Sequence, residues 1–372
     1  MPDSRREFLT GRAAAAQIEA ATARAGAAIL DELGRPVPGR GPTVRLETRA
    51  MACQWQVVLN PGDRAAVMHA SDALDLVHHL ETLMTVYRPD GHLKQLNDAA
   101  GQGPQPADGL LREAVSQAVE LTGETGGCFD ATSGPLVAAW RAARDDGRVP
   151  TDDELADALA RTGVDKVRVD DAAGTIELDA GAELNLGAVG KGFAVHKAAE
   201  FLSEQGIGGF LMHGGASSVT ARGTHRDDAG QEVAWPVGLR NPLLNARRMA
   251  TVLLGDHPDA AARSLGTSGG NVQYFRLGGK RYGHILDPRT GRPAEASLSA
   301  TALCKDAGRA DALSTAAFVG GRDAAEAWCR SGRAGCVWTP PSQGRAIGPE
   351  AIGVPGHSLF WHDAAAETRP TA

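Results

Sequence analysis

Residues 282–293 read Tyr-Gly-His-Ile-Leu-Asp-Pro-Arg-Thr-Gly-Arg-Pro, the most informative run of the chain. The segment places a His and an Asp three residues apart, with the apolar pair Ile285 and Leu286 between them. This pattern predicts a short strand that delivers polar side chains into a turn. His284 at a strand end can transfer a proton or orient a ligand. A surface hairpin with incidental polar residues would explain the segment equally well, so neighbouring motifs are needed to choose.

The composition is that of an ordinary globular protein. Hydrophobic residues make up 42% and charged residues 22% of the 372 positions. The net charge of −7 gives no support for a polyanion-binding surface, so nucleic acid is not expected as a partner. No run of 18 apolar residues occurs, and no transmembrane segment is expected. The five Cys residues are odd in number and form no CxxC pair, which argues against a disulfide framework or a zinc site.

The first 34 residues are expected to be a leader. Residues 4–10, Ser-Arg-Arg-Glu-Phe-Leu-Thr, resemble a twin-arginine export signal. Charged residues at 12, 19 and 24 interrupt the apolar region that should follow, which leaves a cytosolic amphipathic leader as the alternative. Export to the periplasm or cell envelope is favoured over the cytoplasm. Residues 35–42 are expected to be a linker, 43–355 the folded region and 356–372 a loose tail.

Helical and strand patterns mix along the folded region. Helices are predicted at 65–86, 111–122, 151–161 and 191–205, with another beginning within 310–319. Thr151 and Glu154 form a predicted capping box for the third helix. Strands are predicted at 55–59, 167–169, 175–178, 184–186, 209–213, 237–240, 251–254 and 335–338. Because the two kinds of element do not alternate strictly, the pattern favours an α+β fold over a doubly wound one.

Glycine-rich and polar segments supply candidate binding residues. In 185–194, Asn-Leu-Gly-Ala-Val-Gly-Lys-Gly-Phe-Ala, a Gly-rich turn precedes a helix, and Lys191 adds positive charge where a phosphate would bind. The spacing is not that of a Walker A loop, and a generic turn remains the alternative. In 310–315, Asp311 and Thr315 share one helix face and offer oxygen donors suited to Mg²⁺. The alternative is that Asp311 and Thr315 only lie near the start of a helix and bind no metal.

Seven segments, in this order, resemble the ApbE family of FAD:protein FMN transferases. They are 87–90 (Tyr-Arg-Pro-Asp), 127–132 (Gly-Cys-Phe-Asp-Ala-Thr), 186–192 (Leu-Gly-Ala-Val-Gly-Lys-Gly), the pair 214–215, 267–269 (Thr-Ser-Gly), 284–291 and 310–315. The resemblance runs from about residue 49 to 321. One such motif would be weak, but seven in the right order are specific.

The resemblance implies a Mg²⁺-dependent enzyme that transfers the FMN half of FAD to a Thr or Ser hydroxyl of a target flavoprotein and releases AMP. It implies an α+β, T-fold-like architecture of two packed α/β sub-domains with the ligand site between them. His284 is implied as the catalytic or substrate-orienting residue. The implied flavin, adenine or nucleotide contacts are Met51, Tyr87, Cys128, Phe129, Asp130, Asn185, Lys191 and Leu286. The implied Mg²⁺ ligands are the Ala188 carbonyl, Asp311 and Thr315, with Ser314 nearby.

The chain departs from the family pattern at three places. Asn185 stands where the family usually has Asp, Ala52-Cys53 where it has Gly-Thr, and Ala216 where it has Asp after the glycine pair. An amide at Asn185 removes a negative charge but can still form hydrogen bonds. These changes bear on FAD affinity and efficiency more than on the fold.

Two other functions remain open from the sequence. One is an FAD pyrophosphatase, in which water replaces the acceptor hydroxyl, and the other is a protein that binds FAD without turning it over. Residues 214–220 also faintly resemble an acceptor segment, which would allow self-modification, although a strand and turn of the core is favoured for them.

Overall fold

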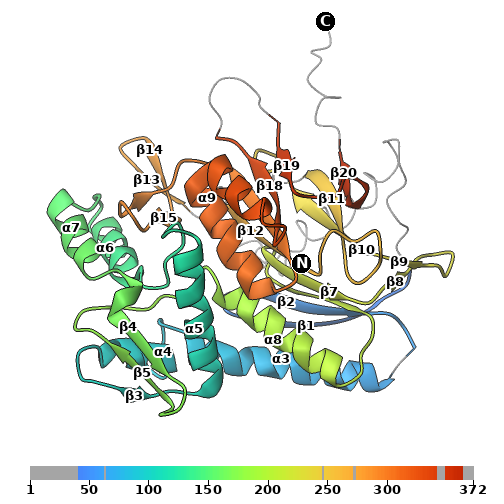
Figure 1. Ribbon diagram of the computed structural model, residues 1–372, viewed down its shortest axis with the longest axis horizontal. Helices are drawn as coiled ribbons and strands as arrows, with labels where there is room; N and C mark the ends of the chain where they lie inside the picture. The colour runs from blue at the N-terminus through green and yellow to red at the C-terminus, as the bar shows by residue number, and fades with distance from the viewer. Residues whose placement is uncertain (1–40, 63, 245–246, 271–273, 342–347, 363–372) are drawn as a thin grey trace, which may run out of the picture.

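An eight-stranded antiparallel sheet forms the centre of the molecule (Figure 1). Every neighbouring pair of strands in it is antiparallel. In spatial order the strands are β1 (Val44–Ala50), β2 (Cys53–Leu59), β6 (Phe210–Gly214), β7 (Ser218–Arg222), β12 (Ser264–Gly269), β17 (Ser299–Cys304), β18 (Gly335–Thr339) and β19 (Glu350–Ile352). Strands far apart in sequence, such as β7 and β12, thereby become neighbours.

This computed structural model describes residues 41–62, 64–244, 247–270, 274–341 and 348–362. The expected leader at 1–34, most of the expected linker and the last part of the expected tail lie outside these residues. None of the described helices is both long and apolar enough to cross a membrane.

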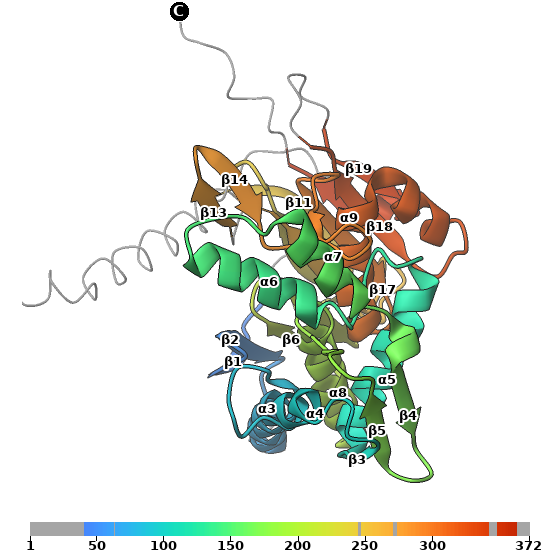
Figure 2. The same cartoon turned by 90° about the vertical axis from the view of Figure 1, so that its left-hand side faces the viewer.

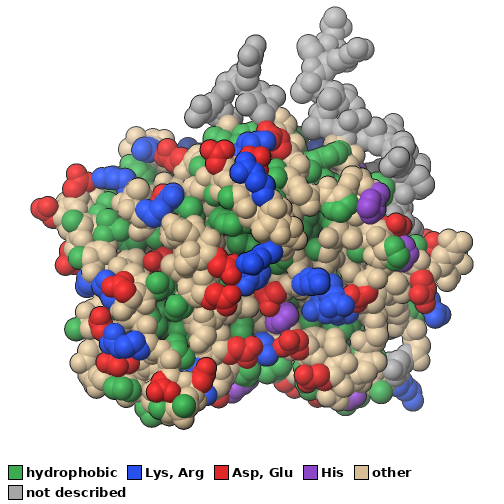
Figure 3. All heavy atoms as spheres, viewed as in Figure 1, with side chains coloured by type: hydrophobic (Ala, Val, Ile, Leu, Met, Phe, Trp, Pro, Cys, Tyr) green, Lys and Arg blue, Asp and Glu red, His purple; other side chains and the backbone are tan. Residues whose placement is uncertain are grey.

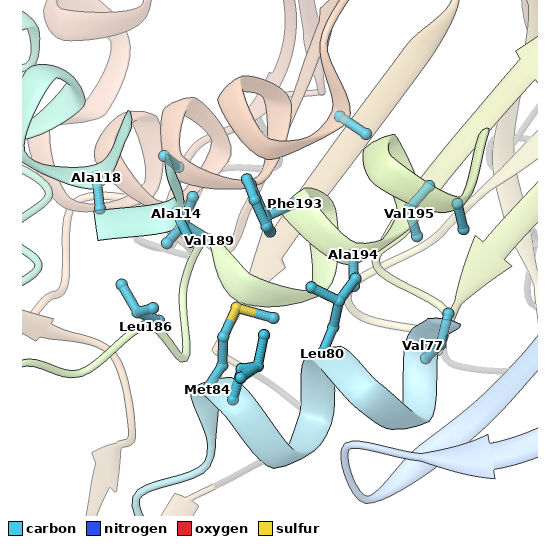
Figure 4. Close-up of a cluster of buried hydrophobic side chains, with 14 of the residues drawn as sticks. Val77, Leu80, Met84, Ala114, Ala118, Leu186, Val189, Phe193, Ala194 and Val195 are labelled. Carbon is cyan, nitrogen blue, oxygen red and sulfur yellow. The ribbon is translucent and has the colours of Figure 1, made fainter. Parts of the chain in front are cut away.

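Three long helices cover one face of the sheet. They are α3 (Arg64–Met84), α8 (Gly190–Glu204) and α9 (Ala307–Cys329). The predicted apolar stripe of α3 is confirmed, because Leu74, Val77, Leu80, Leu83 and Met84 are all buried. Figure 4 shows Leu80 and Met84 of α3 beside Ala194 and Phe193 of α8. Burial of these side chains, rather than helix propensity, holds both helices on the sheet.

A smaller sheet covers the opposite face. Its strands are β10 (Trp235–Arg240), β11 (Arg248–Leu254) and β20 (Leu359–Trp361). Successive residues of the central strands point to opposite faces of the sheet. Leu265 of β12 therefore packs against this smaller sheet, while its neighbour Gly266 faces α9. The expectation of a loose tail from residue 356 is therefore wrong for its described part. A 3₁₀ turn at Gly356–Ser358 leads into β20, which hydrogen-bonds to β11.

A second group of elements is inserted between α3 and α8 and forms a lobe beside the sheet (Figures 1 and 2). It contains α4 (His92–Asp98), α5 (Gly109–Glu124), α6 (Gly134–Asp145), α7 (Asp152–Ala160), a 3₁₀ turn (Val164–Lys166) and the small sheet β3 (Gln105–Pro106), β5 (Thr175–Leu178) and β4 (Val167–Asp170). Leu121 of α5 and Ile176 of β5 belong to the same buried cluster as α3 and α8. The two parts therefore share one core, and the predicted α+β class is confirmed.

Three hairpins complete the described fold. They are β8 (His225–Arg226) with β9 (Glu232–Val233), β13 (Tyr274–Leu277) with β14 (Lys280–Gly283), and β15 (Leu286–Asp287) with β16 (Arg292–Pro293).

The strand predicted at 184–186 is wrong, although most other predicted elements are present. Asn97 of α4 hydrogen-bonds both the N–H and the carbonyl of Leu184, and the Asn185 N–H donates to the Ala131 carbonyl. These groups therefore have partners without a strand ladder. The capping box of α7 is confirmed, with both Thr151–Glu154 hydrogen bonds in place. Helix α9 begins at Ala307, three residues before the range in which its start was predicted, and its helical geometry breaks at Gly321.

Candidate functional site

Asp311 lies where α9 crosses the start of α8. Its side chain is buried, and Oδ2 accepts a hydrogen bond of 3.0 Å from the Gly192 N–H. The Lys191 Nζ lies 4.0 Å from the same oxygen. The N-cap residue of α8 is Val189, whose side chain makes no capping hydrogen bond. Asp311 therefore acts as the cap of α8 from another element, which places a carboxylate, an ammonium group and a helix N-terminus together.

Two glycines permit this close packing. A Cβ at Gly192 would lie 2.2 Å from the Ala307 carbonyl oxygen, and a Cβ at Gly266 would lie 2.4 Å from the Ala310 carbonyl oxygen. Side chains at either position would push α9 away from α8 and β12. The glycines thus fix the depth at which Asp311 is buried.

Burial raises the pKa of Asp311 above its ordinary value. Lys191, the Gly192 N–H and the Ser218 hydroxyl act in the opposite direction, and desolvation outweighs them. A carboxylate in such a position is stabilised by a nearby cation.

Hydroxyl groups surround the same turn of α9. The Ser314 hydroxyl donates to the Asp311 carbonyl over 2.8 Å. The Ser268 hydroxyl lies 2.9 Å from both the Ser314 and the Thr315 hydroxyl oxygens. Asp311, Ser314 and Thr315 therefore share one face of α9, and the structure brings Ser268 of β12 to the two hydroxyls.

The oxygen donors of this cluster fit Mg²⁺ better than a transition metal. Within the described ranges, no group of three or more His, Cys, Asp or Glu residues could hold a metal ion. One carboxylate and several hydroxyl or carbonyl oxygens suit Mg²⁺, which keeps water and substrate oxygens in its shell. Ala188 lies in the turn 187–189 immediately before α8.

Asn185 shapes that turn. Its Oδ1 accepts a hydrogen bond of 2.9 Å from the Gly187 N–H, and the Lys191 Nζ donates to the Gly187 carbonyl over 3.4 Å. A carboxylate oxygen of Asp could accept the same Gly187 hydrogen bond. The departure at Asn185 therefore changes the charge of the turn while its geometry is preserved.

His284 lies between β14 and β15 and is exposed. Asp287 shapes the β15–β16 turn that follows. Its Oδ1 accepts from the Arg289 N–H over 2.9 Å, and its carbonyl accepts from the Gly291 N–H. Trp140 of α6 donates its indole N–H to the Gly291 carbonyl over 2.6 Å. The lobe therefore supports the segment that carries His284, and the half-buried Leu286 begins β15.

Comparison with known proteins identifies the family. The family model of the ApbE family matches residues 51–338. This chain belongs to the ApbE family. The FAD:protein FMN transferase of Vibrio cholerae is 32% identical over 255 residues, which are 67% of this chain and 72% of that protein. That of Salmonella typhimurium is 29% identical over 289 residues, 76% of this chain and 79% of that protein.

Solved structures agree with the ApbE assignment and confirm the family predicted from the motifs. The flavin transferase ApbE from Vibrio cholerae matches with a TM-score of 0.70 and 26% identity, covering 84% of this chain and 98% of that one. The ApbE protein from Thermotoga maritima matches with a TM-score of 0.72 over 84% of this chain and 97% of that one. At 24% identity, the second match shows the fold alone.

The ApbE segment around Cys128 lies against the β15–β16 turn. A Cβ at Gly127 would lie 3.7 Å from Arg289 Cγ. Cys128 is buried beside α9, and burial raises the pKa of its thiol. Phe129 is part of the core. Asp130 Oδ1 accepts from the N–H and hydroxyl of Thr132, and burial raises the pKa of this carboxyl group. The Phe129 and Asp130 side chains are thus engaged within the protein.

Met51 and Ala52 form the tight turn between β1 and β2, and both have positive φ angles, 49° and 58°. The Met51 N–H donates to Glu81 Oε1 of α3 over 2.6 Å. Cys53 follows the turn, and its Sγ would lie 3.3 Å from a Cβ at Gly215, so this corner of the sheet adjoins the glycine pair of the family. Burial raises the pKa of the Cys53 thiol, and the positive charge of Lys191 opposes this shift.

Tyr87 follows α3 and is largely exposed, and the Arg141 guanidinium carbon lies 5.0 Å from its ring centroid. This contact joins Tyr87 to α6 and not to the cluster of Asp311 and Lys191.

Sequence reasoning missed three residues that position the ApbE-family site: Glu81, Ser218 and Trp140. Helical spacing could have placed Glu81 on α3, but its Met51 partner comes from another element. Residues 214–220 are not an accessible acceptor segment, because Ser218 and Thr220 are fully buried and Thr220 hydrogen-bonds Ser264. The core interpretation of this segment is therefore supported.

A separate cavity of about 610 Å³ lies near the other end of α8. Residues lining it include His196, Glu200, Arg222, Arg263 and Asp306, and none of the predicted site residues. Acidic and basic groups alternate there, as they do over the face in Figure 3. The predicted site is instead defined by the convergence of motifs at Asp311.

Proposed function

We propose that this protein is a Mg²⁺-dependent FAD:protein FMN transferase that modifies a Thr or Ser hydroxyl of a target flavoprotein and releases AMP. One observation carries the proposal: the Asp311 carboxylate holds the start of α8 beside Lys191, and the Ser314 and Thr315 hydroxyls lie on the next turn of α9, the helix that carries Asp311. The names of the curated relatives support FAD as the substrate and a protein as the acceptor.

The start of α8 and Lys191 are suited to the FAD pyrophosphate. The first N–H groups of a helix and a lysine ammonium both attract phosphate oxygens. Asn185 holds the turn that leads into this helix. We assign the remaining FAD contacts to the residues expected from the sequence, namely Met51, Tyr87, Leu286 and the segment of Cys128, Phe129 and Asp130. Because the side chains of that segment are buried or hydrogen-bonded within the protein, its backbone groups are the ones proposed to contact FAD.

The Mg²⁺ ligands in this proposal are Asp311, Thr315 and the Ala188 carbonyl, with Ser314 beside them. When bound there, Mg²⁺ offsets the charge that develops on the pyrophosphate oxygens. Ser268 orients the Ser314 and Thr315 hydroxyls through its hydrogen bonds. Asp311 remains charged more readily beside Lys191 than it would alone.

The reaction exchanges one phosphorus–oxygen bond for another. The acceptor hydroxyl oxygen forms a bond to the FMN phosphorus, and the bond from that phosphorus to the bridging oxygen breaks. AMP leaves with the bridging oxygen. In this proposal His284, which is exposed at the end of β14, accepts the hydroxyl proton or orients the acceptor.

The test is incubation of the protein with FAD, MgCl₂ and a threonine-containing acceptor peptide, followed by mass spectrometry. We expect the peptide to gain the mass of FMN and AMP to appear in equal amount. Free FMN with an unmodified peptide would instead identify an FAD pyrophosphatase, and intact protein-bound FAD would identify a binding protein. His284→Ala should bind FAD normally but transfer FMN slowly, by about 10²-fold or more.

A further inference from the structure

The β13–β14 hairpin has one covered face and one exposed face. Phe275 and Tyr282 are register partners whose rings stack at 5.2 Å, and each ring centroid lies within 6.1 Å of that of Trp140 in α6. This face is therefore packed on the lobe, where Figure 2 shows the hairpin above α6. Alternation along the strands directs Tyr274, Arg276 and Arg281 to the other face, and all three are exposed.

The exposed face combines an aromatic ring with two cations. The guanidinium carbons of Arg281 and Arg276 lie 4.0 and 5.8 Å from the Tyr274 ring centroid. Stacking on the ring holds these long side chains in place and reduces the entropy that binding would cost. Among the described residues, no carboxylate forms an ion pair with Arg276.

The charge of the hairpin differs from that of the chain. Residues 274–283 contain three basic side chains and no acidic one, whereas the whole chain has a net charge of −7. Elsewhere, as on the face in Figure 3, acidic and basic side chains are interspersed. The hairpin therefore attracts an acidic partner more strongly than the surrounding surface does.

The hairpin also leads directly to the candidate site. Gly283, its last residue, precedes His284. Arg281 donates to the Gly270 carbonyl just beyond β12, the strand that carries Ser268. Three residues of extended chain from Arg281 to His284 span about 10 Å. A peptide bound along the exposed face would thus have its adjoining residues near His284.

We propose that the exposed face of β13–β14, defined by Tyr274, Arg276 and Arg281, binds an acidic segment of the protein substrate and guides its acceptor hydroxyl to His284. This inference rests on the proposed function. Tyr274 supplies the apolar contact area, while Arg276 and Arg281 select carboxylates near the acceptor.

The test measures peptide binding separately from FMN transfer. Two fluorescently labelled peptides carry one acceptor threonine, flanked by aspartates in the first and by asparagines in the second. Fluorescence anisotropy with the full chain and FAD should show tighter binding of the acidic peptide, weakening as NaCl is raised. Arg276→Glu should lower the affinity for the acidic peptide by about tenfold. Arg276→Lys should retain most of the wild-type affinity for that peptide.

Arg45→Glu is the matched control, because Arg45 is an exposed arginine on β1, at the edge of the central sheet. It should leave peptide affinity unchanged, and none of the variants should alter the dissociation constant of FAD. Equal binding of both peptides, or unchanged binding by Arg276→Glu, would overturn the inference. A matching loss of FAD affinity would also overturn it and assign the hairpin to the FAD site. Failure of the proposed function is separate, since it appears as wild-type protein that transfers no FMN.

Discussion

Asp311 illustrates how one residue couples the site to stability. Its carboxylate is buried at the crossing of α8 and α9, where desolvation raises its pKa. A raised folded-state pKa means that the folded protein binds the proton more tightly than the unfolded chain. Protonation of Asp311 therefore stabilises the folded state. This stabilisation is complete below the unfolded-state pKa near 3.8 and is lost as pH rises through the folded-state pKa. At neutral pH the charged form therefore destabilises the metal-free protein.

We accordingly predict opposite effects of Asp311→Asn on stability and activity. The amide keeps the shape of the side chain and its hydrogen bond with Gly192, but removes the buried charge. The metal-free variant should melt at least about 2 °C higher than the wild type at pH 7, and the gain should shrink as pH falls. Mg²⁺-dependent turnover should fall by about 10²-fold or more.

Thermal melts with and without MgCl₂, together with the FMN transfer assay, check this prediction. Wild-type protein should be stabilised by Mg²⁺ in the presence of FAD, and the variant should not be. Unchanged turnover in Asp311→Asn would refute the metal assignment.

At the scale of the element, α7 shows how local sequence supports the site. Thr151 and Glu154 form the capping box. Leu155 of this helix lies against Gly291, since a Cβ at Gly291 would be 3.5 Å from the Leu155 side chain. Helix α7 therefore supports the β15–β16 turn. Arg148 lowers the pKa of Glu154 to about 2, which keeps this carboxylate charged at all ordinary pH values.

Replacing the capping threonine should destabilise the helix modestly. Thr151→Ala removes the acceptor for the Glu154 N–H and should cost about 1 kcal/mol in the free energy of unfolding. Thr151→Ser keeps the hydroxyl and should be close to wild type. Chemical denaturation measures both, and an equal loss in the two variants would show that the cap contributes nothing.

At the scale of the whole molecule, the lobe and the central sheet share a core. Leu121 of α5 is fully buried in the cluster that also contains Val77 of α3 and Phe193 of α8. Because the lobe has no separate core of that size among the described residues, we expect it to unfold together with the helical face.

Leu121→Ala tests this cooperativity. The cavity should cost about 2–5 kcal/mol, and the melting transitions followed by far-UV circular dichroism and by tryptophan fluorescence should shift together. Leu243→Ala, at a side chain that is 64% exposed, should change little. A second transition that keeps the wild-type midpoint would show that the lobe unfolds independently.

Most of the helices could be predicted because their signals are local. The apolar stripe of α3 and the caps of α7 depend on residues three or four positions apart. The strand predicted at 184–186 failed because Asn97, from another helix, supplies its hydrogen-bond partners. Strands β12 and β17 were missed because their glycine, serine and alanine residues suit close packing under α9 rather than strand propensity.

The sequence by itself determined the family, the α+β class and the residues with chemistry to offer, since these depend on residue types and their order. The leader at 1–34 stays a prediction from that order alone. For His284, the segment read alone left a hairpin as an equal alternative, and the role of this residue came from the family resemblance. Only the tertiary structure decided that Asp311 caps α8 beside Lys191, that Ser268 joins Ser314 and Thr315, and that Trp140 supports the turn after His284. These contacts join residues 46 to 151 positions apart, and no local pattern specifies which distant backbone will approach closely enough.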